Sequence, residues 1–292
     1  MSRKNALRSL AAVAISCVAM SPAYAKSALI WNSQTQIKGT VTIPTGTVVT
    51  VAPRTVIQLS AGAQIIVNGE LLAPSGLTLT GKDWNGLVVT GSATLSSFNE
   101  SGAKTPIRVG PSGKLIIHGG TISGVNGSSA VEGLFIADGI TYDKGDGAGI
   151  NSSNGTADIR IDRSVLSGAG RNSGDFFGVY GAKSITLTNS QMTGAHCAFH
   201  VTGLQNMKLA NDNIHDNAYG FMMYGSSTVG VRSITNTSIT NNNFGFDEGS
   251  ASTKNGPISI SHSYIKKNGQ DLGLVTGKVV VSSPLLINPF TK

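Results

Sequence analysis

The sequence predicts an all-β protein in which short parallel strands wind into a solenoid of stacked coils. Apolar residues alternate with polar ones at period two, and turn residues interrupt the alternation every few positions, as is typical of short strands. Beyond the first 25 residues, no stretch has the spacing of an amphipathic helix. Segments that pair a small residue with an apolar one recur at intervals of 20 to 28 residues. A repeat of this length buries its apolar side only by stacking on a neighbouring repeat.

The first residues are typical of an export signal. Three basic residues without an acid precede the apolar run Ser9–Met20, which is followed by Ala23-Tyr24-Ala25. We therefore expect residues 1–25 to be a signal peptide and residues 26–292 to form a single domain that is exported, to the periplasm or the extracellular medium. Because the apolar run is shorter than the ~20 residues that a bilayer span requires, no transmembrane segment is expected.

The cysteines allow a second interpretation of this segment. Cys17, next to Ser16, has the form of a lipid-attachment site, which would make the protein a lipoprotein. Simple export is preferred because Arg8 lies close before Cys17 and Ala14 stands where such sites usually have leucine. Signal cleavage would leave Cys197 as the one cysteine of the exported chain, so no internal disulfide is expected.

The charge pattern argues against nucleic-acid binding. Loss of the signal peptide removes three basic residues and lowers the net charge from +7 to +4, and the remaining Lys and Arg are scattered singly apart from Lys266-Lys267. Charged residues make up only 13% of the chain, against ~25% in ordinary domains. The hydrophobic share of 40% is regularly placed, which argues against disorder.

Each repeat contains three short strands. The first strand begins at Gly178, Ala198, Gly220, Gly245 and Gly273. The second strand, which ends in a turn residue, is found at 185–189, 207–211, 233–236 and 258–262. A third apolar position follows at Met192, Ile214, Ile239 and Ile265. Three strands close one coil, so stacked coils give three parallel sheets around a shared apolar column, and the mature chain supplies roughly ten coils.

In these repeats the chain resembles the right-handed parallel β-helix proteins of the pectate-lyase-like group, whose repeats are often called carbohydrate-binding and sugar-hydrolysis repeats. The resemblance covers most of residues 26–292 and is strongest over 174–283. The N-terminal segments that resemble the first coils of secreted β-helix proteins are 39–53, 66–71 and 84–89. The resemblance implies a right-handed parallel β-helix, the hand that parallel crossovers take almost without exception. An antiparallel sandwich or barrel would instead show hairpin turns and no fixed repeat.

Asparagines mark one bend of the coil. Asn189, Asn211 and Asn236 occupy the same place in successive repeats. Asparagine tolerates the left-handed backbone conformation, and its amide can bond its neighbour in the next coil. We expect a structural role for these residues. Between Gly119 and Gly149 the register is not set by the sequence, and Gly139–Gly149 is interpreted as a loop inserted between coils.

Period-two geometry places candidate binding residues on the outer surface of the first strand of each repeat. The residues expected to point inward are Val179, Phe199, Phe221 and Phe246. The residues expected to point outward along the same face are Tyr180, His200, Met222, Tyr224 and Asp247. Since aromatic faces suit the apolar side of sugar rings, we expect a polysaccharide or a cell-surface glycan to bind this face. The alternative is a plain polar and aromatic coat on a sheet.

The catalytic candidates are His200, Arg171 and Asp247. The resemblance implies either a lyase, with a basic residue and often calcium, or a hydrolase with paired carboxylates. The sequence matches neither closely, because Asp247 and Glu248 would face opposite sides of a strand, and the motifs of galacturonan hydrolases and pectin methylesterases are absent. No cofactor is therefore expected, and nothing in the sequence supports a calcium site.

A metal site is not expected either. His196 and His200 lie four residues apart on one strand, a separation of ~13 Å that is too long for one ion. Cys197 should face inward as a buried, unreactive thiol.

Three functions stay open at this point. The first is an exported β-helix protein whose elongated outer face binds polysaccharide or a cell-surface partner, without demonstrated catalysis. The second is a polysaccharide-degrading enzyme, a lyase before a hydrolase. The third is a structural, adhesin-like spacer. Fold alone does not select among them, and the sequence specifies no oligomeric state.

Overall fold

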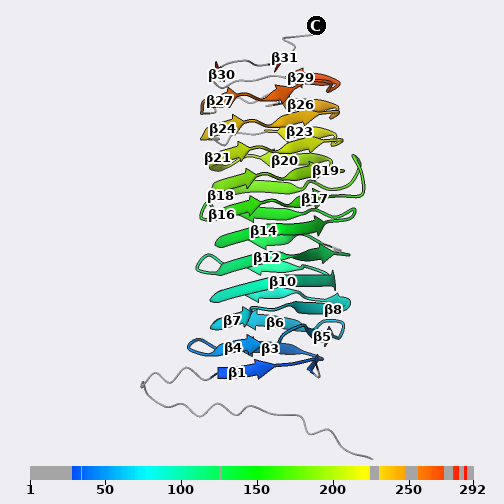
Figure 1. The fold of residues 1–292 in the computed structure, drawn as a ribbon, viewed down its shortest axis with the longest axis vertical. Coiled ribbons are helices and arrows are strands. Elements are labelled where there is room, and N and C mark those ends of the chain that lie inside the picture. The colour runs from blue at the N-terminus through cyan, green and yellow to red at the C-terminus, as the bar shows by residue number, and fades with distance from the viewer. Residues whose placement is uncertain are drawn as a thin grey trace, which may run out of the picture.

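The computed structural model describes residues 28–33, 35–124, 127–223, 230–247, 256–272, 279–282 and 286–287. Within these ranges the chain forms strands and no helix, and every strand pairing is parallel. The strands stack into one elongated body with the coils piled along the long axis (Figure 1). In the described part no helix is long and apolar enough to cross a bilayer. The predicted export signal and Cys17 lie outside the described residues.

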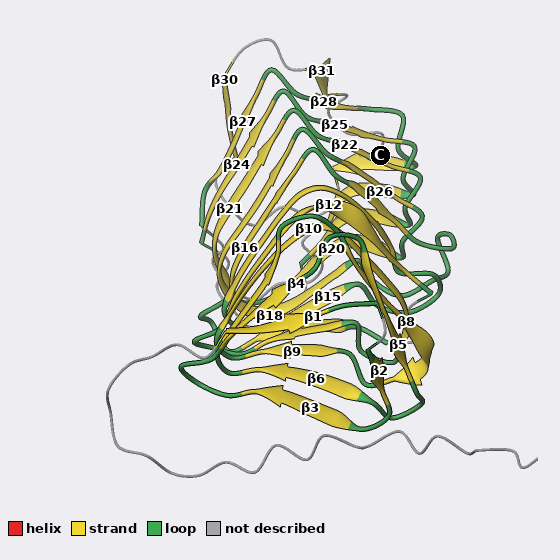
Figure 2. Cartoon of the chain, turned by 60° about the horizontal axis from the view of Figure 1, so that its bottom comes forward, coloured by secondary structure: helices red, strands yellow, loops and turns green. Residues whose placement is uncertain are grey.

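Three parallel sheets surround a common axis (Figure 2). Sheet 1 consists of β3 (Thr40–Ile43), β6 (Gln64–Val67), β9 (Leu87–Val89), β11 (Ile107–Val109), β13 (Ser129–Val131), β15 (Ile150–Ser153), the first part of β18 (Phe177–Thr188), β20 (Cys197–Val201), β23 (Tyr219–Met222), β26 (Phe244–Asp247) and β29 (Gln270–Leu272).

Sheet 2 consists of β1 (Ala28–Trp31), β4 (Val48–Val51), β7 (Glu70–Ala73), the first parts of β10 (Ser92–Ala103), β12 (Lys114–Ser123) and β14 (Leu134–Asp143), then β16 (Asp158–Asp162), the second part of β18, β21 (Leu204–Ala210), β24 (Val231–Thr235), β27 (Ile258–Ser261) and β30 (Val279–Ser282). Sheet 3 consists of β2 (Gln36–Ile37), β5 (Thr55–Leu59), β8 (Leu77–Trp84), the second parts of β10, β12 and β14, then β17 (Val165–Ser167), β19 (Gln191–Thr193), β22 (Asn213–His215), β25 (Ser238–Thr240), β28 (Tyr264–Ile265) and β31 (Leu286–Ile287).

The alternation of apolar and polar residues produces this architecture. In β5 the burial pattern alternates strictly, because every second side chain points to the axis. Stacked partners lie 22, 25 or 26 residues apart in the C-terminal half. The predicted parallel β-helix of three sheets and about ten coils is confirmed.

The asparagine bend is also confirmed. Asn189, Asn211 and Asn236 have positive φ angles of 52°, 60° and 48°. Asn211 Nδ2 donates to Asn189 Oδ1 at 3.0 Å, so the amides link neighbouring coils. Asparagine pays little strain in this left-handed conformation, which explains its recurrence.

A second polar ladder, which the sequence analysis did not identify, is formed by the buried residues that directly follow this bend. The Ser164 backbone N–H donates to Ser190 Oγ at 3.0 Å, and the Ser190 N–H donates to Asp212 Oδ1 at 2.9 Å. The Thr237 N–H continues the pattern by donating to Ser263 Oγ at 3.2 Å. Each buried backbone donor is thus satisfied by a side chain of the following coil.

The structure corrects two sequence-based registers. Phe177, not Val179, pairs with Phe199, and Phe246 pairs with Leu272 rather than Leu274. A small residue does not precede the aligned apolar residue in every repeat. Phe176 stands in this position before Phe177 of β18, and Asp271 stands there before Leu272 of β29.

The segment Gly139–Gly149 is not wholly an inserted loop. β14 runs through Asp143, and its register pairs Gly120 with Ile140 in the preceding coil. Only the residues after Asp143 leave the sheet, before β15 begins. The alternating apolar residues of this segment continue the strand, and the charged residues that follow them form the turn.

Candidate functional site

The sheet 1 strands of the C-terminal half have two inward residues in succession. In β23 and β26 the burial pattern is half-buried, buried, buried, half-buried. A Cβ on Gly220, the second residue of β23, would lie 2.9 Å from Ile239 Cγ2 of the core, so this position points inward beside Phe221. Positions one and four of each strand therefore lie on the same outer surface.

The fourth positions form the predicted row at His200, Met222 and Asp247. Register pairs Gly178 with His200, His200 with Met222, and Met222 with Asp247. His200 and Asp247 lie two coils apart, about 9.6 Å by the strand spacing, so they make no dyad. The expected row is wrong at its first member, since Gly178 and not Tyr180 occupies it.

Tyr180 nevertheless lies beside this row. Its side chain is 54% exposed, and its ring packs edge-on against His200 with centroids 5.7 Å apart. The predicted binding residue Tyr224 lies outside the described residues. Tyr180, His200, Met222 and Asp247 thus share one face, as expected from period two.

The first positions form a second row, made by Asp175, Cys197, Tyr219 and Phe244. The rings of Tyr219 and Phe244 stack with centroids 4.8 Å apart and an interplanar angle of 7°. His196 packs edge-on against Tyr219 at 5.4 Å. An aromatic ladder therefore runs along the outside of the sheet, and sequence analysis missed it because alternation assigns these positions to the core.

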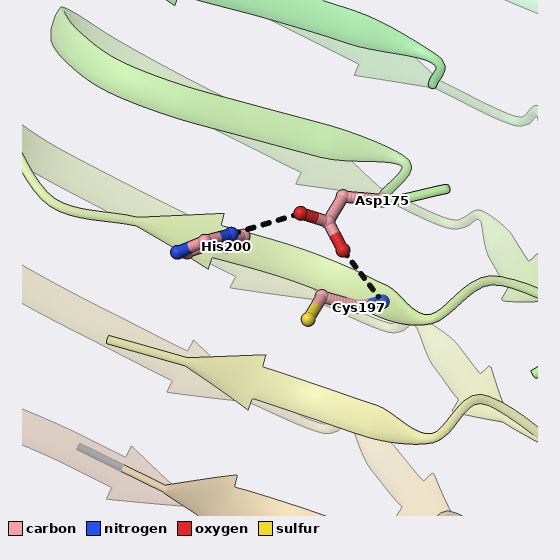
Figure 3. Close-up of side chains that lie close together, drawn as sticks. All are labelled: Asp175, Cys197 and His200. Atoms are coloured by element: carbon pink, nitrogen blue, oxygen red, sulfur yellow. Dashed lines mark hydrogen bonds and ion pairs between the residues drawn. The ribbon is translucent and has the colours of Figure 1, made fainter. Parts of the chain in front are cut away.

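Asp175 is the polar centre of the face (Figure 3). His200 Nδ1 donates to Asp175 Oδ2 at 2.8 Å, and His196 Nδ1 donates to Asp175 Oδ1 at 3.0 Å. The Cys197 backbone N–H donates to Oδ1 at 3.2 Å. Burial by itself would raise the pKa of Asp175, but the hydrogen bonds from His200, His196 and Cys197 outweigh it and lower the pKa to about 2.

The two histidines meet one carboxylate, contrary to the separation expected from sequence. The expected ~13 Å assumes that both histidines lie on one extended strand. Because β20 begins at Cys197, His196 lies in the preceding turn and this assumption does not hold. The sequence does contain a signal for this contact, because Asp175 precedes His196 and His200 by 21 and 25 residues, about one coil. The signal predicts a contact only when the register between the two coils is known.

Cys197 is fully buried, as predicted, but the expected inward direction is wrong: it lies in the outer row with Tyr219, and side chains of that face cover its thiol. Sγ lies 3.3 Å from His196 Nδ1 and 3.2 Å from Met222 Sδ. Burial raises the pKa of this thiol, and the negative charge of Asp175 raises it further. Cys197 is therefore protonated and poorly nucleophilic as it stands. Ligand atoms of Asp175, Cys197 and His200 all lie within 4.8 Å of one another.

Arg171 does not join His200. Its guanidinium donates to Asn243 Oδ1 at 2.9 Å and to the backbone carbonyl of Asn241, and lies 3.5 Å from an oxygen of Asp216. Because Asn243 directly precedes Phe244, Arg171 lies at the margin of the aromatic ladder. Its contacts span several coils.

Lys144 is a charged group behind this face that sequence analysis did not single out. It is fully buried, and its Nζ donates to Gly147 O and to Ser173 Oγ, each at 2.8 Å. Burial lowers its pKa to about 8, against the opposing charges of Asp175, Asp146 and Asp143. Lys144 comes from the segment 139–149, and its bond to Ser173 links that segment to the turn leading to Asp175.

Comparisons with known proteins bear on the fold. Neither the protein-family models nor the curated protein sequences that were compared match this chain. The structure is similar to the A-module of the mannuronan C-5 epimerase AlgE4 of Azotobacter vinelandii, with a TM-score of 0.53 over 88% of this chain and 91% of that one. Since the two sequences are only 14% identical, the similarity shows a shared parallel β-helix fold.

Proposed function

We propose that the outer surface of sheet 1 binds a polysaccharide. The observation that carries this proposal is the aromatic ladder, in which the Tyr219 and Phe244 rings stack on the outside of the sheet while Tyr180 stands exposed nearby. The apolar side of a sugar ring packs on aromatic side chains, and its hydroxyls bond neighbouring polar groups. Because the Tyr219 and Phe244 rings cover each other's inner faces, the sugar would contact the outer edge of the ladder and the exposed ring of Tyr180. His196 and Arg171 supply polar groups beside the rings.

The shape of the face suits an extended chain rather than a single sugar. The ladder and the His200 row run parallel across successive coils, each displaced by ~4.8 Å. The name of the structural neighbour says that it acts on mannuronan, which supports a glycan as the ligand class. Export of the protein, expected from residues 1–25, would bring it into contact with such polymers.

Affinity electrophoresis in gels that contain single polysaccharides tests this function. We expect retardation by at least one polysaccharide, weakened roughly fivefold by Tyr219→Ala because an aromatic contact of this kind contributes about 1 kcal/mol. Tyr264→Ala is the matched control, since Tyr264 is a half-buried tyrosine on β28 of sheet 3. Equal retardation of the two variants would contradict the proposal.

A second function, polysaccharide processing by proton abstraction, is favoured by the bond between Asp175 and His200. With Nδ1–H donated to Asp175, the lone pair of the neutral ring lies on Nε2, and the carboxylate orients the ring as in other base dyads. Removal of the proton next to a uronate carboxylate is the step by which lyases begin. His200→Gln should then abolish product formation in a screen of acidic polysaccharides without abolishing retardation.

Hydrolysis by Asp175 and Asp247 is disfavoured. The two residues lie three coils apart, about 14 Å by the strand spacing. Glycosidases place their two carboxyl groups roughly 5 to 9.5 Å apart. The lyase alternative therefore stands before the hydrolase alternative, as the sequence also indicated.

A further inference from the structure

Side chains with metal-ligating atoms converge on the outer surface of sheet 1. We name this group the soft-donor cluster, and its members are Asp175, His196, Cys197, His200 and Met222. The Cys197 thiol lies 3.3 Å from His196 Nδ1 and 3.2 Å from Met222 Sδ. Atoms of Asp175, Cys197 and His200 lie within 4.8 Å of one another. Such separations are close to those between ligands that share one ion through bonds of about 2.0 to 2.3 Å.

The coil register creates this convergence. Two successive inward residues, Ala198 and Phe199, return both Cys197 and His200 to the outer surface of one strand. Register then sets Asp175 one coil before Cys197, and Met222 one coil after His200. The donors come from three successive coils of a rigid solenoid, so their arrangement does not depend on a ligand.

The donor types select the class of ion. Calcium and magnesium prefer six or more oxygen ligands, whereas four of the five donors here are nitrogen or sulfur. Imidazole and thiolate suit zinc and copper, and a thioether beside them favours copper. We propose that the soft-donor cluster binds one thiophilic transition-metal ion, copper in preference to zinc.

The site has an opening to solvent and a closed inner side. The side chains of His196, His200 and Asp175 are 43%, 19% and 20% exposed, whereas Cys197 is fully buried behind them. An ion therefore enters past the histidines and meets the sulfur last. Binding forms a metal–sulfur bond and breaks the S–H bond, and the thiol proton leaves to solvent, one for each ion bound. An imidazole that binds through Nδ1 carries its proton on Nε2 instead, with no net change in protons. No oxidation or reduction is involved.

Anaerobic titration of the purified protein with Cu(I), against a chromophoric Cu(I) chelator, tests the proposal without any glycan. We expect one Cu(I) per chain, and a loss of affinity of more than about 100-fold in Cys197→Ser. Met222→Leu should weaken Cu(I) by about tenfold or more and leave Zn(II) affinity unchanged. His118→Gln, an exposed histidine of β12, is the control.

The outcomes separate clearly. Absence of stoichiometric Cu(I) binding, equal affinity of the wild type and Cys197→Ser, or tighter binding of Zn(II) than of Cu(I) each overturns the proposal. If Cys197→Ser does not fold, His196→Gln replaces it, because this side chain is 43% exposed and its loss disturbs no core. Because no polysaccharide is present, failure here leaves the glycan-binding function untouched, and the reverse also holds.

Discussion

At the scale of single residues, environment sets opposite behaviour for two aspartates of this protein. Asp175 accepts hydrogen bonds from two imidazoles, and its pKa falls to about 2. Asp212 is 3% exposed and accepts only from the backbone N–H groups of Ser190 and Ala210. Burial dominates there and raises its pKa to about 7. The Asp212 carboxyl therefore favours the neutral form, in the position that Ser and Thr occupy in other coils.

Stability should fall as pH rises through the range where Asp212 ionises. The unfolded carboxyl has a pKa near 3.8 and the folded one near 7, so the folded state binds more protons between these values. Its contribution is fully present below about pH 4 and lost by about pH 7, at most about 4 kcal/mol. Urea unfolding at about pH 4.5 and 7.5 should show this decline in the wild type and a flatter dependence in Asp212→Asn. Asp146→Asn, on an exposed turn, is the control, and parallel slopes in wild type and Asp212→Asn would refute the prediction.

The left-handed bend makes a second prediction at this scale. Asn211 has φ of 60° and donates its amide to Asn189. Asn211→Gly loses the hydrogen bond, about 1 kcal/mol, and needs no Cβ in left-handed backbone. Asn211→Ala loses the same hydrogen bond and keeps a Cβ there without a polar group that can bond locally, so it should be about 1 to 2 kcal/mol less stable than the glycine variant. Chemical denaturation should rank the free energies of unfolding as wild type, then Gly, then Ala. An alanine variant as stable as the glycine variant would show that the bend is not strained.

At the scale of elements, the sheet 1 strands carry both the core and the site. Phe177, Phe199, Phe221 and Phe246 form one continuous inner stack, with successive ring centroids 5.0, 4.8 and 4.8 Å apart. In each of these strands the residue after the ring and the residue two before it face outward, on either side of the inward pair. The packing that buries the phenyl ring of a strand therefore also sets the positions of its outward residues.

Removal of one ring should destabilise the solenoid strongly. Phe221→Ala leaves a cavity between two stacked rings and should cost about 3 to 5 kcal/mol of unfolding free energy, whereas Phe221→Leu should cost less than about 2. The measurement is urea unfolding followed by circular dichroism. Tyr180→Ala, at an exposed ring, should change stability by about 0.5 kcal/mol or less. Equal losses for Phe221→Ala and Tyr180→Ala would contradict the inner stack.

At the scale of the whole molecule, the solenoid is quasi-one-dimensional, because each described strand pairs only with strands of the coils directly before and after it. The ligand face is correspondingly local. The aromatic ladder and the soft-donor cluster both lie in the C-terminal half, between β18 and β26, while the N-terminal coils extend the stack (Figure 1).

Coupling between substitutions should therefore decay with coil separation. Phe199→Leu and Phe221→Leu alter stacked rings and should show an interaction energy of about 0.5 to 3 kcal/mol in a double-mutant cycle. Phe221→Leu combined with Ile57→Val of the N-terminal β5 should be additive within about 0.5 kcal/mol. Equal coupling for both pairs would mean that the stack does not behave as a chain of nearest neighbours.

The sequence by itself determined the solenoid. Period-two alternation and the repeat interval specify short stacked strands, and asparagine at one place in each repeat specifies a left-handed bend, since both are local properties of the backbone. Alternation also placed His200, Met222 and Asp247 on one outer face, which register confirms.

Only the tertiary structure decided which side chains meet there. A strand with two successive inward residues breaks the alternation on which the sequence argument rests, and the extra inward residue returns Cys197 and Tyr219 to the outer surface. The partner of His200 is Asp175 of the preceding coil, because the observed register of β18 and β20 differs by two residues from the one that the sequence predicts. Contacts between coils depend on register across the stack, and register is fixed by the packing of rings and small residues at the axis, which no single repeat contains.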